Sequence, residues 1–351
     1  MTGSAPGVSV GLIANPSSGH DVRRLISGAS IATNLEKVNV IRRLLAGLGA
    51  SGVDRVLMMP DVSGLTLGVE RLAAKHRLDR DGTWPELELV RMDVHRTAAD
   101  TRAATTAMTA AGVGAIVVLG GDGTARALAA VIDDTPVLAL STGTNNAFGV
   151  MTDATVAGMA AGLVASGTCA VEEGCGRAKR LEVRVGDRVE LALIDVAVVD
   201  GTEVGARAIW EPDALREIVV TVAEPGAIGL SAIAAAVAPC SRSDRQGRHL
   251  VCAPSGRAVR VPLAPGLVRS VGVMEVIPLD LGEPIELRSG SGVLALDGER
   301  EMVLRGEGPP NVTLSLGGPV VIDVPTVLRL AAERGWFAGA AATSSSAPEA
   351  R

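Results

Sequence analysis

The chain is poor in aromatic residues: its 351 residues include 3 Trp, 2 Phe and no Tyr. Proteins that bind RNA or single-stranded DNA commonly stack bases on aromatic side chains, so this shortage argues against such a function. The formal net charge of −6 points the same way, because surfaces that bind nucleic acids are basic. We therefore expect no nucleic-acid partner.

Lysine is also scarce. The chain has only Lys37, Lys75 and Lys179, and none of them follows a glycine. This excludes the G-x-x-x-x-G-K-[ST] loop of P-loop proteins and the V-A-I-K strand of protein kinases. The first predicted strand-to-helix turn also lacks the G-x-G-x-x-G dinucleotide fingerprint. A nucleotide bound by this chain therefore needs a different phosphate site.

Cysteine pairs and long apolar runs are missing too. The four cysteines contain no C-x-x-C pair, which favours a reduced chain with buried thiols over a zinc site. No run approaches the ~20 apolar residues that cross a bilayer, and no signal peptide is visible at the N-terminus. We expect a cytoplasmic protein with no membrane partner.

Over the first 150 residues, apolar runs alternate with helical patterns. Predicted strands are Val8–Ala14, Val53–Met59, Leu87–Met92, Ala115–Leu119 and Val137–Leu140. Such alternation is typical of parallel βαβ units with helices on both faces of the sheet. Ligands bind beyond the carboxyl ends of the strands in these sheets. Three polar turns follow strand ends and are expected to converge on one edge: Asn15–Gly19, Gly120–Thr124 and Ser141–Asn146.

The second half has short apolar runs bounded by Gly or Pro, which indicates a mainly β region, either a sandwich or stacked sheets. Leu181–Val185 and Val189–Val199 are predicted to form a hairpin. We expect four segments: an α/β nucleotide-binding domain at 1–150, a mainly β substrate domain at 151–325, a closing helix at 326–338 that packs back on the α/β domain, and a disordered tail at 339–351.

The turn Gly120–Thr124 is the strongest candidate for chemistry. It joins an apolar strand to a helical pattern, and the N-terminus of a helix after a glycine turn offers backbone N–H groups to a phosphate. Asp122 is unusual among such glycines, because a carboxylate repels a phosphate unless it binds a metal or accepts a proton. The alternative is an ordinary turn in which Asp122 caps the helix.

Three motifs together resemble the NAD kinase/diacylglycerol kinase superfamily: Gly120-Gly121-Asp122-Gly123-Thr124, Asn15-Pro16-Ser17-Ser18-Gly19 and Gly143-Thr144-Asn145-Asn146. The amino-acid sequences of two segments, Ser141–Phe148 and Val204–Trp210, are most similar to the branch associated with acetoin catabolism, the AcoX group. The resemblance runs from about Val8 to Leu330. It implies an N-terminal Rossmann-like α/β domain and a C-terminal β-sandwich domain, with the active site between them.

The resemblance implies an ATP-dependent kinase that uses Mg²⁺. The expected reaction is phosphorylation of the adenosine ribose 2′-hydroxyl of NAD(H) to give NADP(H), by a homo-oligomer that associates through its β domain. The implied catalytic residue is Asp122, and no metal ligand is assigned. The implied nucleotide and phosphate site contains Asn15, Ser18, Gly19, Gly120, Gly121, Gly123, Thr124, Gly143, Thr144, Asn145 and Asn146; the implied substrate site contains Asp195, Asp297 and Glu299.

Some positions depart from the family pattern and leave alternatives open. NAD kinases hold the dinucleotide with an Asn-Glu pair, where this chain has Ile194-Asp195. The acceptor could therefore be another small-molecule or lipid hydroxyl, or the chain could be a non-catalytic nucleotide sensor linked to acetoin catabolism.

The identity of the general base is also open. Asp122 competes for this role with the Asp297–Glu299 segment, although Asp297-Gly298 also fits a plain hairpin turn. Arg126 could neutralise phosphate, but among many arginines each one is expected to be a solvated surface charge.

Overall fold

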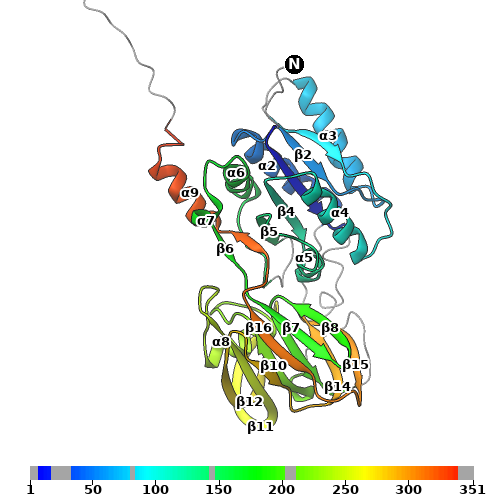
Figure 1. The fold of residues 1–351 in the computed structure, drawn as a ribbon, viewed down its shortest axis with the longest axis vertical. Helices are drawn as coiled ribbons and strands as arrows, with labels where there is room; N and C mark the ends of the chain where they lie inside the picture. Colours follow the sequence, from blue (N-terminus) through cyan, green and yellow to red (C-terminus); the bar gives the residue numbers. More distant parts are fainter. Residues whose placement is uncertain (1–6, 17–32, 80–83, 142–146, 202–210, 339–351) are drawn as a thin grey trace, which may run out of the picture.

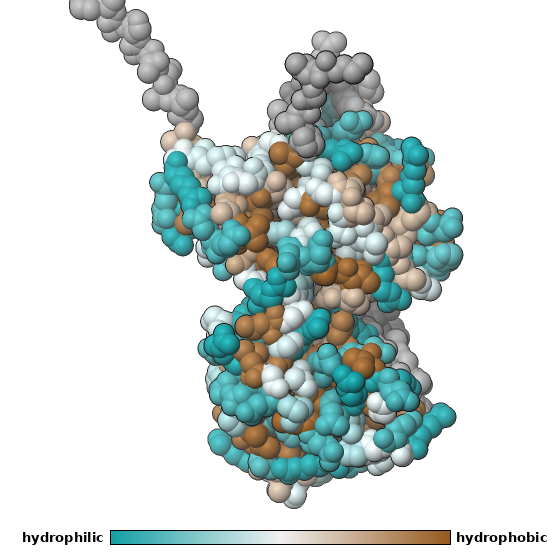
Figure 2. Space-filling model, viewed as in Figure 1, coloured by the Kyte–Doolittle hydropathy of each residue, from teal (hydrophilic) through white to brown (hydrophobic). Residues whose placement is uncertain are grey.

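The computed structural model describes residues 7–16, 33–79, 84–141, 147–201 and 211–338, with only the backbone at 77–79 and 299–301. An α/β domain and a sheet-rich domain lie end to end (Figure 1). Hydrophilic and hydrophobic residues are interspersed on the visible face of both (Figure 2). The expected combination of an α/β domain with a β domain is confirmed.

The α/β domain is built on a seven-stranded sheet in the order β3-β2-β1-β4-β5-β17-β6. The first five of these strands pair in parallel, as the alternating pattern predicts. The last two come from later in the chain, and β6 is antiparallel to β17. The bounds are β1 Ser9–Ala14, β2 Arg55–Met58, β3 Glu86–Leu89, β4 Ala115–Gly120, β5 Val137–Ser141, β6 Cys175–Arg177 and β17 Val320–Ile322.

Helices cover both faces of this sheet because its strands are apolar on both sides. In β4, Val117 and Leu119 belong to one core cluster, whereas Ile116 and Val118 belong to the cluster on the other face. The first face packs against α2 (Asn34–Ala50), α3 (Leu65–Asp79), α6 (Ala154–Ala165) and α9 (Val324–Glu333). The second packs against α4 (Ala98–Ala110) and α5 (Asp122–Ala129), and a short α7 (Val171–Gly174) precedes β6.

The C-terminal domain stacks two antiparallel sheets. The six-stranded sheet has the order β12-β11-β10-β9-β14-β15 and the four-stranded sheet has the order β13-β16-β7-β8. One apolar cluster joins the inner faces of the sheets, and a second joins the larger sheet to α8. The bounds are β7 Arg180–Val185, β8 Arg188–Ala192, β9 Asp195–Val199, β10 Leu215–Val220, α8 Leu230–Val237, β11 Gln246–Ala264, β12 Leu267–Asp280, β13 Pro284–Glu286, β14 Ser291–Leu296, β15 Glu299–Arg305 and β16 Asn311–Ser315, with a 3₁₀ turn at Pro212–Ala214.

The predicted strand Val189–Val199 is wrong as a single element. The chain pairs with β7 as β8, leaves the small sheet at Leu193–Ile194, and enters the large sheet as β9 between β10 and β14. At the break, the amides of Leu193 and Ile194 donate to the carboxylate of Asp297 instead of continuing the ladder. A side chain about a hundred residues away therefore ends the strand.

Candidate active site

The turn between β4 and α5 packs closely over the side chain of Thr124. Gly121 caps α5 with φ −90° and no side-chain hydrogen bond, so Asp122 is the first helical residue and not the cap. A Cβ on Gly120 would lie 2.7 Å from the Cβ of Thr124, which is buried beneath the turn. Gly120 is therefore needed to admit the Thr124 side chain.

The first polar turn is tied to this second one. Asn15 follows β1, and its Nδ2 donates to Oγ1 of Thr124 at 3.0 Å. Beneath it, Lys37 of α2 is 1% exposed, and its Nζ donates to the carbonyls of Asn15 at 3.1 Å and Pro16 at 2.6 Å. Two of the three expected turns thus lie together. Sequence reasoning missed Lys37, for which only the rarity of lysine offered a signal.

Asp122 binds backbone from the third turn. Its carboxylate accepts the amides of Ala147 and Phe148, both at 3.0 Å, and the residue is half-buried. Ala147 and Phe148 directly follow the predicted Gly143–Asn146 motif. That motif, with Ser18 and Gly19, lies outside the described residues.

The C-terminal domain contributes two buried carboxylates. Asp297 and Gly298 have φ of 51° and 75°, as the two-residue turn between β14 and β15 requires, so the predicted hairpin is confirmed. The Asp297 side chain accepts the amides of Leu193 at 2.9 Å and Ile194 at 2.8 Å. Asp195 in turn accepts the amide of Gly298 at 3.0 Å. The two acids thus hold the strand break against the turn. The side chain of Glu299 lies outside the described part.

Arg126 links the two sets of residues. It lies one helical turn beyond Asp122 in α5, and its Nε is 3.8 Å from Oδ2 of Asp297. Its side chain is only 16% exposed, so the expectation of a solvated surface charge is wrong for this arginine. The start of α5 and the β14–β15 turn therefore face each other at the domain junction.

Apolar contacts run beside this ion pair. Ala125 and Ala129 of α5 share one buried cluster with Phe148, and with Leu193 and Ile194 at the strand break. The residues that surround Asp122 and those that surround Asp297 are thus packed together across the junction.

The charges at this junction influence one another. Burial raises the pKa of Asp297 well above its ordinary value, and the neighbouring Asp195 adds to this effect. Arg126 and the Ile194 amide oppose it, while the charge of Asp122 raises the pKa further. The charge of Asp122 is thus one of those that act on Asp297, although the two residues belong to different domains.

Comparison with known proteins identifies both halves of the chain. Residues 10–168 match the family described as ATP-NAD kinase N-terminal domain. Residues 179–316 match the Acetoin catabolism protein X C-terminal domain. The Acetoin catabolism protein X of Cupriavidus necator is 39% identical over 328 residues, which cover 91% of each protein.

This chain belongs to the acetoin catabolism protein X family. Its fold is also similar to that of yeast NADH kinase, solved in complex with NADH. That structure shares 15% sequence identity with a TM-score of 0.52, over 95% of this chain and 89% of the kinase. The resemblance to an NAD kinase-like, AcoX-type protein is therefore confirmed.

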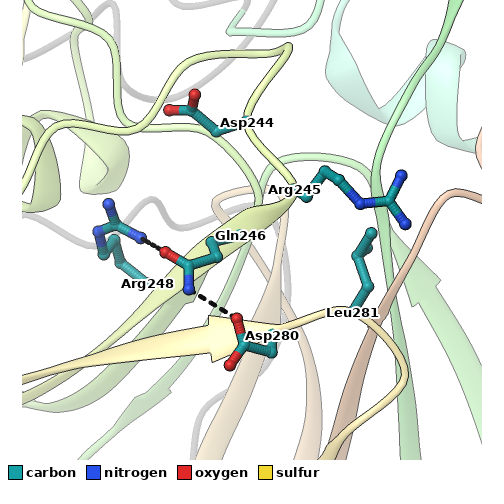
Figure 3. Close-up of a pocket in the computed structure, with 6 residues that line it drawn as sticks. All are labelled: Asp244, Arg245, Gln246, Arg248, Asp280 and Leu281. Carbon is teal, nitrogen blue, oxygen red and sulfur yellow. Dashed lines mark hydrogen bonds between the residues drawn. The ribbon is translucent and has the colours of Figure 1, made fainter.

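The AcoX-family chain has a further pocket of about 530 Å³ at the start of β11, lined by Asp244, Arg245, Gln246, Arg248, Asp280 and Leu281. Gln246 lies between Arg248 and Asp280 and hydrogen-bonds to both, whereas Arg245 points away from them (Figure 3). These residues are not the ones described above around Asp122, Arg126 and Asp297 at the domain junction.

Two features are absent from the described residues. They contain no group of three or more His, Cys, Asp or Glu side chains arranged to hold a metal ion. In that same part of the chain, no helix is both long and apolar enough to cross a membrane.

Proposed function

We propose that this AcoX-family chain is an ATP-dependent phosphotransferase acting on a hydroxyl group, with NAD(H) as the first candidate acceptor and NADP(H) as its product. One observation carries the proposal: Arg126, one helical turn beyond Asp122 in α5, lies 3.8 Å from Asp297 of the other domain, so the helix that begins with Asp122 faces the Asp195–Asp297 pair. The family match over residues 10–168 supports this proposal.

Phosphoryl transfer requires mainly that two oxygens be aligned and that spreading negative charge be neutralised. The N-terminus of α5 contributes a favourable partial charge, and the hydrogen bond between Asn15 and Thr124 fixes the adjacent turn. Mg²⁺ belongs to the ATP–Mg²⁺ substrate in this proposal. The phosphates of ATP would lie near the predicted residues Asn15, Gly120, Gly121, Gly123 and Thr124.

Of the two candidate bases, the geometry favours Asp122. The side chain of Asp297 is 1% exposed and already accepts the amides of Leu193 and Ile194, so a substrate hydroxyl cannot approach it. Asp122 is half-buried at the start of a helix, and two amides orient its carboxylate. We assign Asp122 the role of accepting the proton of the substrate hydroxyl. We assign Asp195 and Asp297 the role of holding the strand break in place on the acceptor side of the site.

A second acceptor class is favoured by Ile194. This residue occupies the position at which the resemblance leads us to expect an amide, and it is 2% exposed within the apolar cluster at the junction. Asp195 beside it accepts the amide of Gly298. A different small hydroxyl compound is therefore the alternative, and the name of the Cupriavidus relative suggests hydroxyketones related to acetoin.

The acceptor can be identified by one assay. The protein is incubated with ATP–Mg²⁺ and, separately, NAD, NADH, acetoin or a metabolite pool, and ADP release and product mass are measured. We expect ADP release with NAD or NADH and a product heavier by one phosphoryl group. Release with another compound alone identifies that acceptor instead. ATP binding without release of ADP in any mixture supports a nucleotide sensor and contradicts the proposal.

The Asp122→Asn variant tests the assigned base. We expect turnover to fall by about 10²–10⁴-fold, because a positioned base contributes that much to a proton transfer. The fold should persist, because the amide oxygen still accepts a backbone hydrogen bond. Asp133→Asn is the matched control: this acid follows α5 and hydrogen-bonds to the nearby Thr135. Near-native turnover of Asp122→Asn would remove Asp122 from the mechanism.

A further inference from the structure

The loop between α8 and β11 is anchored at both ends by one buried lysine. Lys179 is 3% exposed, and its Nζ donates to the carbonyls of Ser241 at 2.9 Å and Gln246 at 2.7 Å. The Sγ of Cys240 lies 3.6 Å from the same Nζ. Burial lowers the pKa of Lys179, and the nearby Cys240 opposes that shift. Lys179 therefore holds both ends of the loop formed by residues 241–246 against the β domain.

Arg242 extends from this loop across the domain junction. Its Nη2 donates to the carbonyl of Ala147 at 2.6 Å, and its Nη1 donates to the carbonyl of Phe148 at 3.3 Å. Behind it, Nε lies 3.7 Å from Oε2 of Glu224, and the Arg242 amide donates to Oε1 of the same residue at 3.4 Å. Glu224 thus orients the arginine toward the α/β domain.

Ala147 and Phe148 are therefore held from two sides. Their amides donate to Asp122, and their carbonyls accept from Arg242. A shift of this backbone moves the amides that orient the Asp122 carboxylate. The position of the Arg242 side chain therefore affects the position of the Asp122 side chain through this segment. The guanidinium of Arg242 contacts the carbonyls of this segment, so its effect on Asp122 passes through the Ala147–Phe148 backbone.

We propose that Arg242 is a positioning residue that holds the Ala147–Phe148 backbone against Asp122 and thereby couples the β domain to the phosphoryl-transfer turn. This role rests on the proposed function. The planar guanidinium suits it, because two donors with fixed geometry match two successive carbonyls. A lysine at this position supplies the charge but only one compact donor group.

Kinetics of matched arginine variants test this role. We expect Arg242→Ala to lower kcat by about 10–100-fold, as the loss of an orienting partner commonly does, with a much smaller change in KM for the acceptor. Arg242→Lys should fall between Arg242→Ala and the unaltered protein. In an Asp122→Asn background, Arg242→Ala should lower kcat little further, because both changes disturb the same group.

Arg248 provides the control. It also donates to two successive backbone carbonyls, those of Ala238 at 3.2 Å and Pro239 at 3.1 Å, but both belong to its own domain. We expect Arg248→Ala to retain kcat within about twofold, since these two contacts stay within the β domain. An equal loss of kcat in Arg248→Ala and Arg242→Ala would mean general loosening of the loop and would overturn the proposal.

Hydrogen exchange gives a readout that requires no activity. We expect the amides of Ala147 and Phe148 to exchange faster in Arg242→Ala and, to a smaller extent, in Arg242→Lys, but not in Arg248→Ala. If these amides respond as expected while the unaltered protein phosphorylates no acceptor, the proposed function fails and the positioning contact remains. Unchanged exchange in both Arg242 variants overturns the positioning role, whatever the activity. Arg242→Lys serves for both measurements if Arg242→Ala does not fold.

Discussion

The two domains place their candidate site residues in different ways. In the α/β domain, Asn15 and Thr124 are 109 residues apart, but both lie at the carboxyl ends of parallel strands that pair side by side, so the repeated strand-turn-helix pattern places them at one edge of the sheet. In the β domain, Asp195 and Asp297 meet across 102 residues through a strand break and a hairpin turn. The difference shows that a site can combine turns that a repeating pattern places at one sheet edge with acids that meet only through an irregular feature of the folded sheets.

Close packing takes different forms at two places in the molecule. In the α/β domain, helix backbones approach each other: a Cβ on Gly47 of α2 would lie 2.1 Å from the carbonyl oxygen of Thr155 in α6. In the β domain, His249 and Glu217 are buried as a pair, with their side chains 2.9 Å apart. We therefore expect backbone proximity to limit substitution at Gly47, and the buried polar partner to limit it at His249 and Glu217.

The largest expected effect on stability is that of Asp297→Ala. This change leaves the buried amides of Leu193 and Ile194 without their acceptor and Arg126 without its carboxylate, so we expect a loss of about 2–5 kcal/mol in the free energy of unfolding. Urea denaturation measures it. Asp297→Asn keeps an acceptor oxygen and should lose less. If Asp297→Ala is as stable as the unaltered protein, this carboxylate does not hold the strand break.

A smaller effect is expected from Gly158→Ala in the α/β domain. The new Cβ would lie 2.4 Å from the carbonyl oxygen of Leu44, which is backbone and cannot swing away, so α6 must move from α2. We expect a loss of about 1–3 kcal/mol in thermal or urea unfolding. Gly176→Ala is the control, since its Cβ would meet nothing within 4 Å. Equal stability of the two variants would contradict the close-packing account of α2 and α6.

The smallest effect is a pH dependence with opposite sign in the two domains. The folded pKa of Asp297 is raised above the ordinary 3.8, chiefly by burial. The folded protein then binds more protons than the unfolded chain from about pH 3.8 up to the raised pKa, so this group makes stability fall as pH rises, by at most about 1.4 kcal/mol per pH unit. Asp297→Asn should remove that slope from the free energy of unfolding.

Asp133 of the α/β domain provides the comparison for this measurement. Its pKa is lowered, first by hydrogen bonding to the Thr135 side chain and then by the Thr135 amide. The stabilisation from this group is present above pH 3.8 and is lost as pH falls through the lowered pKa. Asp133→Asn should therefore change stability at acidic pH in the opposite direction. The same slope in both variants would contradict the difference between the two acids.

Much of the α/β domain could be predicted because its signals are local. Apolar runs mark the strands, and the Gly120–Thr124 turn lies at the end of β4, as its glycines indicate. The insertion of β17 and β6 into this sheet could not be predicted, because two short strands with no special pattern pair there with a distant part of the chain. The split of Val189–Val199 was missed for a related reason: a run that is apolar except for Glu190 and Asp195 carries no sign that Asp297 will bind its amides.

The environments of the buried cationic side chains could not be predicted from the sequence either. Lys37, Arg126 and Lys179 have no local feature that separates them from surface charges, yet each is mostly enclosed by partners from other elements. A charged side chain is buried only where distant groups compensate its lost hydration, and that compensation exists only in the folded protein.

The amino-acid sequence alone thus determined the family resemblance, the parallel arrangement of the first strands and the turn that carries Asp122, because each depends on motifs or apolar patterns that are local in the chain. Tertiary structure decided which groups surround that aspartate. The amides of Ala147 and Phe148 bind it, Arg126 connects its helix to Asp297, and Arg242 reaches its neighbours from the other domain. The contacts of Arg126 and Arg242 depend on how the two domains meet.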